Sequence, residues 1–348
     1  MIPQQLSSET TQDREPSIGV NPVNTRIICA SAFTPNPDGD TETAPIFITD
    51  NGGATWTLNN ILPSGSGSTG DISVKFNSIG DRLYAGILKG GSGTFLNVLE
   101  TENPLNNTLM NELFNRTEVD QPFIQARTLS GTTIEDKLFI GSNMGSNNTS
   151  STIHTTQNAR ETTPTFSNIS IDSRSGRKDR PSIRPTIHSD GTVYAVFVAA
   201  LASSPSNESN IVVVRDDNWG RNNYLDLIDP SDSKAGFKVA SNVNVPRVGE
   251  SLGAERISSR LSIIVHPNNS NILYLAFGTT ISNIFTLHVV SSTDRGLTWS
   301  NDLLTIQNAT NPALAITTSG TIGFSYQQLK TLTTTNRWET HFRGSKWV

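Results

Sequence analysis

The stretch Ser292-Thr-Asp-Arg-Gly-Leu-Thr-Trp299 is the most informative part of this sequence for the fold. It lies between two short apolar runs, 285–290 and 303–306, whose β-branched residues are typical of strands. Asp294 can accept hydrogen bonds from backbone N–H groups in a tight turn, and Gly296 can adopt a positive φ without steric cost. The tryptophan that ends the stretch can fold back as a large apolar side chain between strands. The stretch therefore predicts a β-hairpin turn within a sheet.

A second copy, Thr49-Asp-Asn-Gly-Gly-Ala-Thr-Trp56, follows the apolar run 45–48. Both copies have the order Ser/Thr-x-Asp/Asn-x-Gly-x-Thr-Trp, which is the Asp-box, and on these residues the chain resembles the sialidase-like (BNR-repeat) β-propellers. The resemblance implies an architecture but not an activity, because the residues of the box hold a turn. The residues assigned to these structural turns are Thr49, Asn51, Gly52, Trp56, Ser292, Asp294, Gly296 and Trp299.

A longer repeat runs along the whole chain. Polar residues precede a short apolar strand, which a turn connects to a second apolar strand, at intervals of about 50 to 80 residues. The six pairs are 15–20 with 27–30, 71–76 with 83–87, 121–124 with 137–140, 180–183 with 193–197, 260–264 with 273–277, and 311–316 with 322–326. This period is typical of propeller blades. We therefore predict an all-β, six-bladed β-propeller of four-stranded antiparallel blades, forming one domain over residues 1–348.

The ends of the chain suggest how the ring closes. The sixth repeat reaches Val348 too early for a full fourth strand, and the segment Ile2–Ser7 precedes the first inner strand. We expect this N-terminal segment to pair with the last blade, so that only short sheet edges stay unpaired. The alternative is that the chain is a fragment and that Trp347 begins a further box.

Composition argues against several functional classes. The net charge of -5 argues against a general nucleic-acid binder. No apolar run approaches the roughly 20 residues of a membrane span, and no signal peptide is visible. The single cysteine, Cys29, lies in an apolar run and is expected to be a buried, inert thiol. The resemblance favours an extracellular or cell-surface location, and the oligomeric state is left open.

The segments that lead into the inner strands of a propeller converge around one opening of its central channel. The polar residues of these segments are therefore the candidate ligand-binding residues: Asp13, Arg14, Glu15, Asp71, Asp120, Asp179, Arg180, Arg260 and Asn311. Carboxylates mixed with guanidinium groups suit a sugar or an anionic group. Alternatively, these residues pair with one another around a water-filled channel.

The sequence predicts no cofactor and no dedicated metal site. The five histidines are scattered and lack the spacing of metal ligands. One alternative stays open, in which the carboxylates of Asp71, Asp120 and Asp179 hold a calcium ion at the channel mouth.

The resemblance to sialidases can be followed residue by residue. That family binds the substrate carboxylate with three arginines and uses an Asp acid/base and a Tyr nucleophile paired with a Glu. On this resemblance Arg14 and Arg180 match two of the arginines, and Asp71 matches the acid/base. The third arginine is missing from its expected position, and Asn311-Pro312 and Tyr326-Gln327 replace the Tyr-Ser and Tyr-Glu pairs. Since loss of a nucleophile removes orders of magnitude in rate, sialidase activity is not expected.

Two functions stay open, and they leave undecided whether the chain is an enzyme. The missing nucleophile favours a non-catalytic propeller that binds a glycan or a protein, as a module of a larger extracellular assembly. The alternative is a glycoside hydrolase, or a related carbohydrate-active enzyme, that uses carboxylates at the channel mouth. A carboxylate separation of about 5–5.5 Å or about 6.5–9.5 Å would indicate a retaining or an inverting hydrolase.

Overall fold

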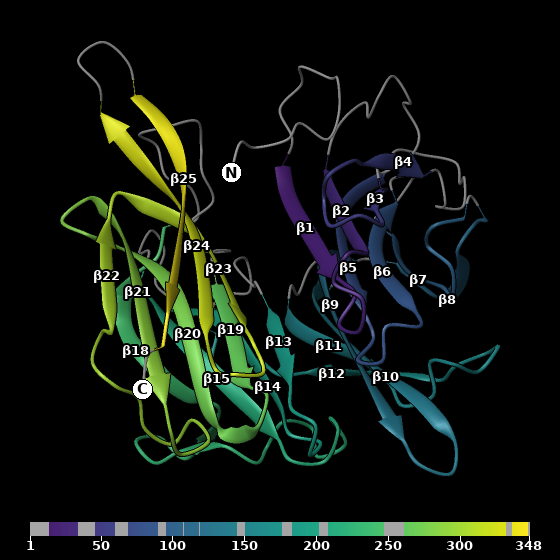
Figure 1. Cartoon of the computed structure of the whole chain (residues 1–348). Coiled ribbons are helices and arrows are strands. Elements are labelled where there is room, and N and C mark those ends of the chain that lie inside the picture. Colours follow the sequence, from purple (N-terminus) through teal and green to yellow (C-terminus); the bar gives the residue numbers. More distant parts are fainter. Residues whose placement is uncertain are drawn as a thin grey trace. The chain divides into compact units, whose positions relative to one another are not determined.

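The computed structural model describes residues 14–33, 46–59, 69–89, 95–106, 108–117, 119–144, 150–175, 183–201, 208–246, 261–331 and 336–346. Within these ranges every regular element is a β-strand (Figure 1). No helix there is long and apolar enough to cross a membrane. Successive antiparallel sheets follow one another along the chain. The chain is an all-β, six-bladed β-propeller, which confirms the predicted fold class.

The first three sheets each contain four strands in chain order. The first consists of β1 (Arg14–Val20), β2 (Ile28–Phe33), β3 (Ile46–Thr49) and β4 (Thr57–Asn59). The second consists of β5 (Thr69–Phe76), β6 (Leu83–Lys89), β7 (Phe95–Thr101) and β8 (Asn111–Thr117). The third consists of β9 (Val119–Ser130), β10 (Ile134–Met144), β11 (Ser150–Thr156) and β12 (Phe166–Ser170).

The other three sheets follow the same plan. The fourth consists of β13 (Arg184–Ile187), β14 (Val193–Ala200), β15 (Glu208–Asp216) and β18 (Phe237–Asn244), and a hairpin of β16 (Ile228–Asp229) and β17 (Lys234–Ala235) precedes its outer strand. The fifth consists of β19 (Leu261–His266), β20 (Asn269–Ile281), β21 (Ile284–Ser292) and β22 (Leu304–Gln307). The sixth shows three strands among the described residues, β23 (Ala309–Ile316), β24 (Ile322–Thr331) and β25 (Asn336–Ser345). The predicted closing strand at 2–7 and the alternative box at Trp347 both lie outside the described residues.

The chain divides into two compact units, residues 1–146 with 153–168, and residues 147–152 with 169–348. In each unit, apolar side chains fill the space between neighbouring sheets. Examples are Cys29, Ile72 and Leu83 in the first unit, and Val213, Ile263 and Leu275 in the second. Burial raises the pKa of the Cys29 thiol to about 12, which confirms a buried, inert cysteine. The single-domain assignment stays a prediction.

Side-chain hydroxyls join each inner strand to the next one within a unit. Ser17 Oγ accepts the Val74 N–H at 3.1 Å, and Ser73 Oγ accepts the Ile124 N–H at 3.1 Å. In the second unit, the same kind of bond joins Thr186 to Val265 at 3.3 Å and Ser262 to Leu314 at 3.0 Å. These bonds fix the level of one inner strand against its neighbour, although the two strands belong to different sheets.

The fourth inner strand is described from Arg184 onward. The prediction put it at 180–183, but Arg184–Ile187 is the segment that pairs with β14, with Ile187 opposite Val193. The sequence there is a tandem Arg-Pro-Ser-Ile and Arg-Pro-Thr-Ile, and the second copy supplies Thr186 for the bond to β19. Residues 180–182 of the predicted segment lie outside the described residues, so their part in this strand stays a prediction.

The two predicted turns have nearly the same hydrogen bonds. Thr49 Oγ1 accepts the N–H of Gly53 at 3.1 Å, and Ser292 Oγ accepts the N–H of Gly296 at 2.9 Å. The side chains two positions later, Asn51 and Asp294, accept the N–H of a threonine at 3.0 and 2.9 Å. Both tryptophans that end the turns are half-buried. One Ser or Thr hydroxyl and one Asn or Asp oxygen therefore organise each turn.

The glycine of the first turn that matches Gly296 is Gly53, the neighbour of the predicted Gly52. Gly53, with φ of 88°, matches Gly296, with φ of 83°. The predicted residue Gly52, with φ of 74°, instead matches Arg295, which adopts φ of 65°. Two consecutive residues of each turn thus have left-handed backbone, and the first copy uses glycine for both because glycine adopts it without steric cost.

Three further sheets have a related turn after their third strand. Thr101 and Thr156 accept the N–H of the residue two positions later, at 3.1 and 3.3 Å. Asp216 Oδ1 accepts the N–H groups of Asn218 and Gly220 at 2.8 and 2.9 Å. The usable signal is a Ser, Thr or Asp at the end of the third strand with an Asn two residues on.

Replacing Ser73 by alanine should destabilise the protein by about 1–3 kcal/mol, because the buried Ile124 N–H would lose its acceptor. Ser130→Ala, at the exposed end of β9, is the matched control and should change stability by less than about 0.5 kcal/mol. Chemical denaturation of both variants measures the difference. Equal stabilities would show that the hydroxyl bond does not contribute to holding the inner strands together.

Candidate functional site at the starts of the inner strands

Four inner strands are irregular where they begin. The register with the second strand shifts between Arg14 and Ser17 in β1, between Thr69 and Ile72 in β5, opposite Gly141–Asn143 in β9, and between Thr310 and Ala313 in β23. A β-bulge of this kind redirects side chains and is over-represented beside active sites. The shifts fall on the segments that the sequence analysis selected as candidate ligand-binding residues.

In the first unit, the structure brings two predicted carboxylates to neighbouring strands. Asp71 lies in the irregular start of β5, two residues before Ser73, and it is half-buried. Asp120 lies at the start of β9, four residues before Ile124, and it is exposed. The Ser73–Ile124 hydrogen bond holds these strands side by side at the same level. Two carboxylates therefore stand at the same end of adjacent inner strands.

The backbone next to Asp120 is strained. Gln121 has φ of 53° although it is not glycine, and it is buried directly before Pro122. Asp120 Oδ1 accepts the Gln121 N–H at 3.0 Å, and this bond supports the conformation. A left-handed residue other than glycine costs of order 1–3 kcal/mol and is found preferentially at functional sites. The strain is therefore consistent with a site at the start of β9.

The second unit repeats this arrangement at Asn311. Asn311 has φ of 56° and precedes Pro312. Its Nδ2 donates a hydrogen bond to Gln327 Oε1, on the neighbouring β24. Its Oδ1 is buried and lacks a hydrogen-bond partner among the described residues. A buried amide oxygen of this kind can accept a hydroxyl from a ligand or a water.

The other predicted site residues lie at the edge of the described ranges or outside them. Arg14 and Glu15 begin β1, and only their backbone is described. Four candidates lie outside the described residues: Asp13, Asp179, Arg180 and Arg260. No group of three or more His, Cys, Asp or Glu residues that could hold a metal ion occurs in the described part of the chain. Since Asp179 lies outside that part, both the calcium alternative and the prediction of no cofactor stay untested.

Asp136, a fully buried carboxylate, has a structural role. It is fully buried and accepts hydrogen bonds from Tyr84 at 2.7 Å, Thr128 at 2.6 Å and Asn77 at 3.0 Å. Arg160 Nε lies 2.9 Å from its Oδ2. Both carboxylate oxygens of Asp136 thus accept hydrogen bonds from protein groups of the second and third sheets. Asp136 is therefore no candidate for catalysis.

A buried Ser-His-Asn arrangement is also unsuitable for catalysis. His154 Nε2 lies 2.7 Å from Ser142 Oγ, and His154 Nδ1 lies 2.5 Å from Asn168 Oδ1. The serine and the histidine are completely buried, so a substrate cannot reach the hydroxyl. Burial lowers the pKa of His154 to about 4, despite the opposing hydrogen bond with Asn168. The imidazole is therefore neutral and serves as a structural link across three strands.

The low pKa of His154 should make the stability of the protein depend on pH. The unfolded chain binds a proton below about pH 6.5, whereas folded His154 binds it only near about pH 4. The contribution of neutral His154 to the free energy of unfolding is therefore fully present above about pH 6.5, and it is lost as the pH falls toward about 4. Between pH 7 and 5 the loss should be about 2 kcal/mol. Denaturant titrations at both pH values measure it.

His154→Gln should reduce this pH dependence, because glutamine does not titrate. His266→Gln, in the turn after β19, is the matched histidine control and should retain it. The same slope in wild type and His154→Gln would contradict the assignment.

Comparison with known proteins gives matches in structure but not in sequence. No protein-family model matches the chain. No curated protein matches it. The GH93 α-L-arabinofuranosidase of Fusarium graminearum, solved with arabinobiose, aligns with a TM-score of 0.57 and 9% identity over 97% of this chain and 95% of that chain. The Penicillium chrysogenum α-L-arabinanase with arabinobiose aligns with a TM-score of 0.54 and 10% identity over 95% and 93%. At these identities the likeness shows the fold alone.

These matches contradict the prediction of a non-catalytic binding module. The solved propellers that match along nearly the whole chain include an arabinofuranosidase and an arabinanase, which are hydrolytic enzymes. The prediction relied on the missing tyrosine nucleophile of one enzyme family. Its absence removes one chemistry from a fold that supports others. The glycoside hydrolase alternative is therefore the better supported of the two.

Proposed function

We propose that the chain is a glycoside hydrolase, or a related carbohydrate-active enzyme, that uses carboxylates at the starts of its inner strands. The observation that carries the proposal is the placement of Asp71 and Asp120 at the same end of β5 and β9. Most glycosidases use two carboxyl groups that flank the scissile bond. The shared fold with an arabinofuranosidase and an arabinanase supports the same class of reaction.

The proposed mechanism assigns the two carboxyl groups complementary tasks. One protonates the leaving-group oxygen, and the other either attacks the anomeric carbon or activates a water on the opposite face of the sugar. Both groups sit on inner strands that a hydrogen bond holds at a fixed level, so their separation is set by the fold and not by a loop. The strained Gln121 beside Asp120 further limits how that side chain can move.

A relationship to the sialidase-like Asp-box propellers is part of the same proposal. The nearly matching hydrogen bonds of the two turns support it. Sialidase activity is excluded from the proposal, because Asn311-Pro312 stands where that family has a Tyr-Ser pair. The other tyrosine of the comparison, Tyr326, is buried, stacks with aromatic rings and accepts a hydrogen bond from Arg343 Nε at 3.2 Å. A tyrosine held in this way is not available as a nucleophile. Carboxylate chemistry does not require it.

Asp71→Asn and Asp120→Asn should each lower kcat by at least about a hundredfold on the substrate that the wild type cleaves, because proton transfer or nucleophilic attack would be lost. A panel of aryl glycosides that begins with α-L-arabinofuranosides, together with arabinan, identifies that substrate. Glu112→Gln, an exposed carboxylate on the outer strand β8, is the matched control and should keep full activity.

Retention of activity in both aspartate variants would refute the assigned residues. Absence of turnover on the whole panel by folded wild-type protein would count against the enzyme class itself. Where the wild type is active, proton NMR of the first-formed sugar shows whether the anomeric configuration is retained or inverted. The result distinguishes a nucleophilic carboxylate from one that activates water.

A further inference from the structure

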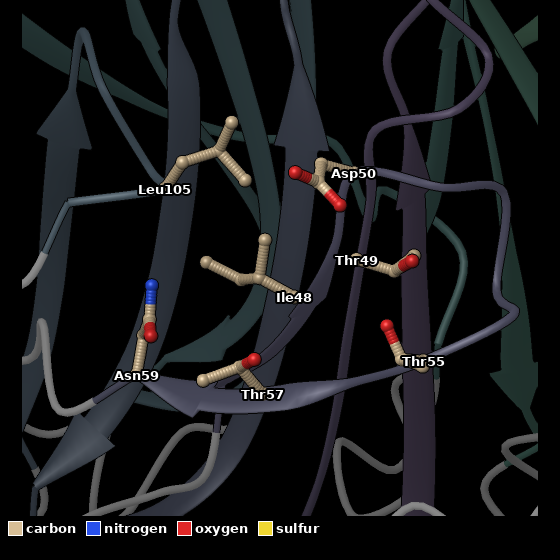
Figure 2. A pocket seen from close by; sticks show the side chains of 7 residues that line it. All are labelled: Ile48, Thr49, Asp50, Thr55, Thr57, Asn59 and Leu105. Atoms are coloured by element: carbon tan, nitrogen blue, oxygen red, sulfur yellow. The ribbon is translucent and has the colours of Figure 1, made fainter.

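A small cavity of about 160 Å³ lies at the far end of the first sheet (Figure 2). Its lining comes from the end of β3, the turn after it, β4, and Leu105 in the turn after β7. Register places Val20 opposite Ile28, and Ile28 opposite Thr49. The cavity therefore lies at the end of this sheet opposite to the start of its inner strand.

Asp50 is the charged group of this cavity, and the turn does not use it. Thr49 and Asn51 make the side-chain hydrogen bonds of the turn. The Asp50 carboxylate makes no hydrogen bond or ion pair with any residue in the described ranges. Figure 2 shows it directed toward the side of Ile48 and Leu105. The second turn has Thr293 at this position, so an acid is not needed for the turn to form.

The other polar groups of the lining have hydrogen-bonding capacity left. The exposed Thr57 hydroxyl has no partner among the described residues. Thr55 Oγ1 accepts Asn51 Nδ2 at 2.6 Å and so keeps its own proton for donation. Asn59 Nδ2 donates to the carbonyl of Pro104 at 2.9 Å, which leaves Oδ1 as an acceptor. Donors and acceptors thus face one space.

The lining of the cavity also has an apolar part. Leu105 is 43% exposed, and buried Ile48 lies beside it in the lining. A sugar ring presents hydroxyls at its rim and C–H groups on its faces, so it needs polar partners together with an apolar wall. The volume is below the roughly 300–1,000 Å³ of drug-sized ligand sites and suits one sugar ring.

We propose that this cavity is an accessory carbohydrate-binding site that takes a single neutral sugar residue at the rim of the first sheet. Asp50 would accept two hydroxyl hydrogen bonds, as charge-assisted bonds that are stronger than neutral ones. The carboxylate disfavours an anionic ligand, and no group of three or more His, Cys, Asp or Glu residues that could hold a metal ion occurs among the described residues. The site goes beyond the proposed catalysis, and binding here does not depend on Asp71 or Asp120.

Calorimetric titration with arabinose, xylose, galactose and glucose, and native gels that contain arabinan or xyloglucan, test the proposal. Wild-type protein should bind one of the sugars, and the matching polysaccharide should retard it. Asp50→Asn should weaken binding about tenfold, because a charge-assisted bond becomes a neutral one. Thr57→Val, which keeps the shape of the side chain, should weaken it by a smaller factor.

Thr293→Ala is the matched control, since it changes the same position of the second turn and should bind as wild type. Sugar binding that is unchanged in both Asp50→Asn and Thr57→Val would overturn the proposal, and so would absence of binding at millimolar sugar. Hydrolysis of a small aryl glycoside separates the two proposals. Asp50→Asn should leave it unchanged, whereas Asp71→Asn should lower it at least about a hundredfold without affecting this cavity.

Discussion

The hydroxyl-to-backbone bonds between successive inner strands are the contacts on which the rest of each unit depends. Neighbouring blades face each other through side chains, so their inner strands share no hydrogen-bond ladder. Ser17 and Ser73 in one unit, and Thr186 and Ser262 in the other, supply the side-chain hydrogen bonds to the next strand. Apolar contacts alone would allow the sheets to slide, because hydrophobic attraction is not directional. A hydrogen bond to a defined N–H fixes the level of each strand.

The fixed level explains why the irregular starts of β1, β5 and β9 lie next to one another within the first unit. Three of the four bulges include a proline, Pro16, Pro122 or Pro312, which cannot donate a hydrogen bond to a ladder. The second blade uses Gly70 and Asp71 at the same place. Each strand therefore begins with a short segment whose backbone is free of regular pairing. Side chains of these segments can therefore contact a ligand.

The sequence predicted the features that depend on local chemistry and missed those that depend on distant partners. Turn residues and apolar alternation identified the six pairs of strands and both turns, because glycine, Asp and Thr act within a few residues. The sequence did not show that Thr186 would bond to the next inner strand, because its partner Val265 is distant in the sequence. The turns at Thr101 and Thr156 were missed because each retains the capping oxygen but has lost the glycine and tryptophan of the repeat.

The candidate site shows the same division between local and distant causes. Sequence placed Asp71 and Asp120 before inner strands, and the structure holds those strands side by side through Ser73. Comparison with one enzyme family then led to the wrong preference for a non-catalytic module, because it treated a missing tyrosine as a missing activity. On this chain Tyr326 is buried among aromatic rings and hydrogen-bonded to Arg343, so it has a structural role in the sixth sheet. The fold supplies strand starts at a defined level, and the chemistry depends on which side chains occupy them. The proposed function places two carboxylates at the starts of adjacent strands. Their chemistry needs neither a tyrosine nor a third arginine.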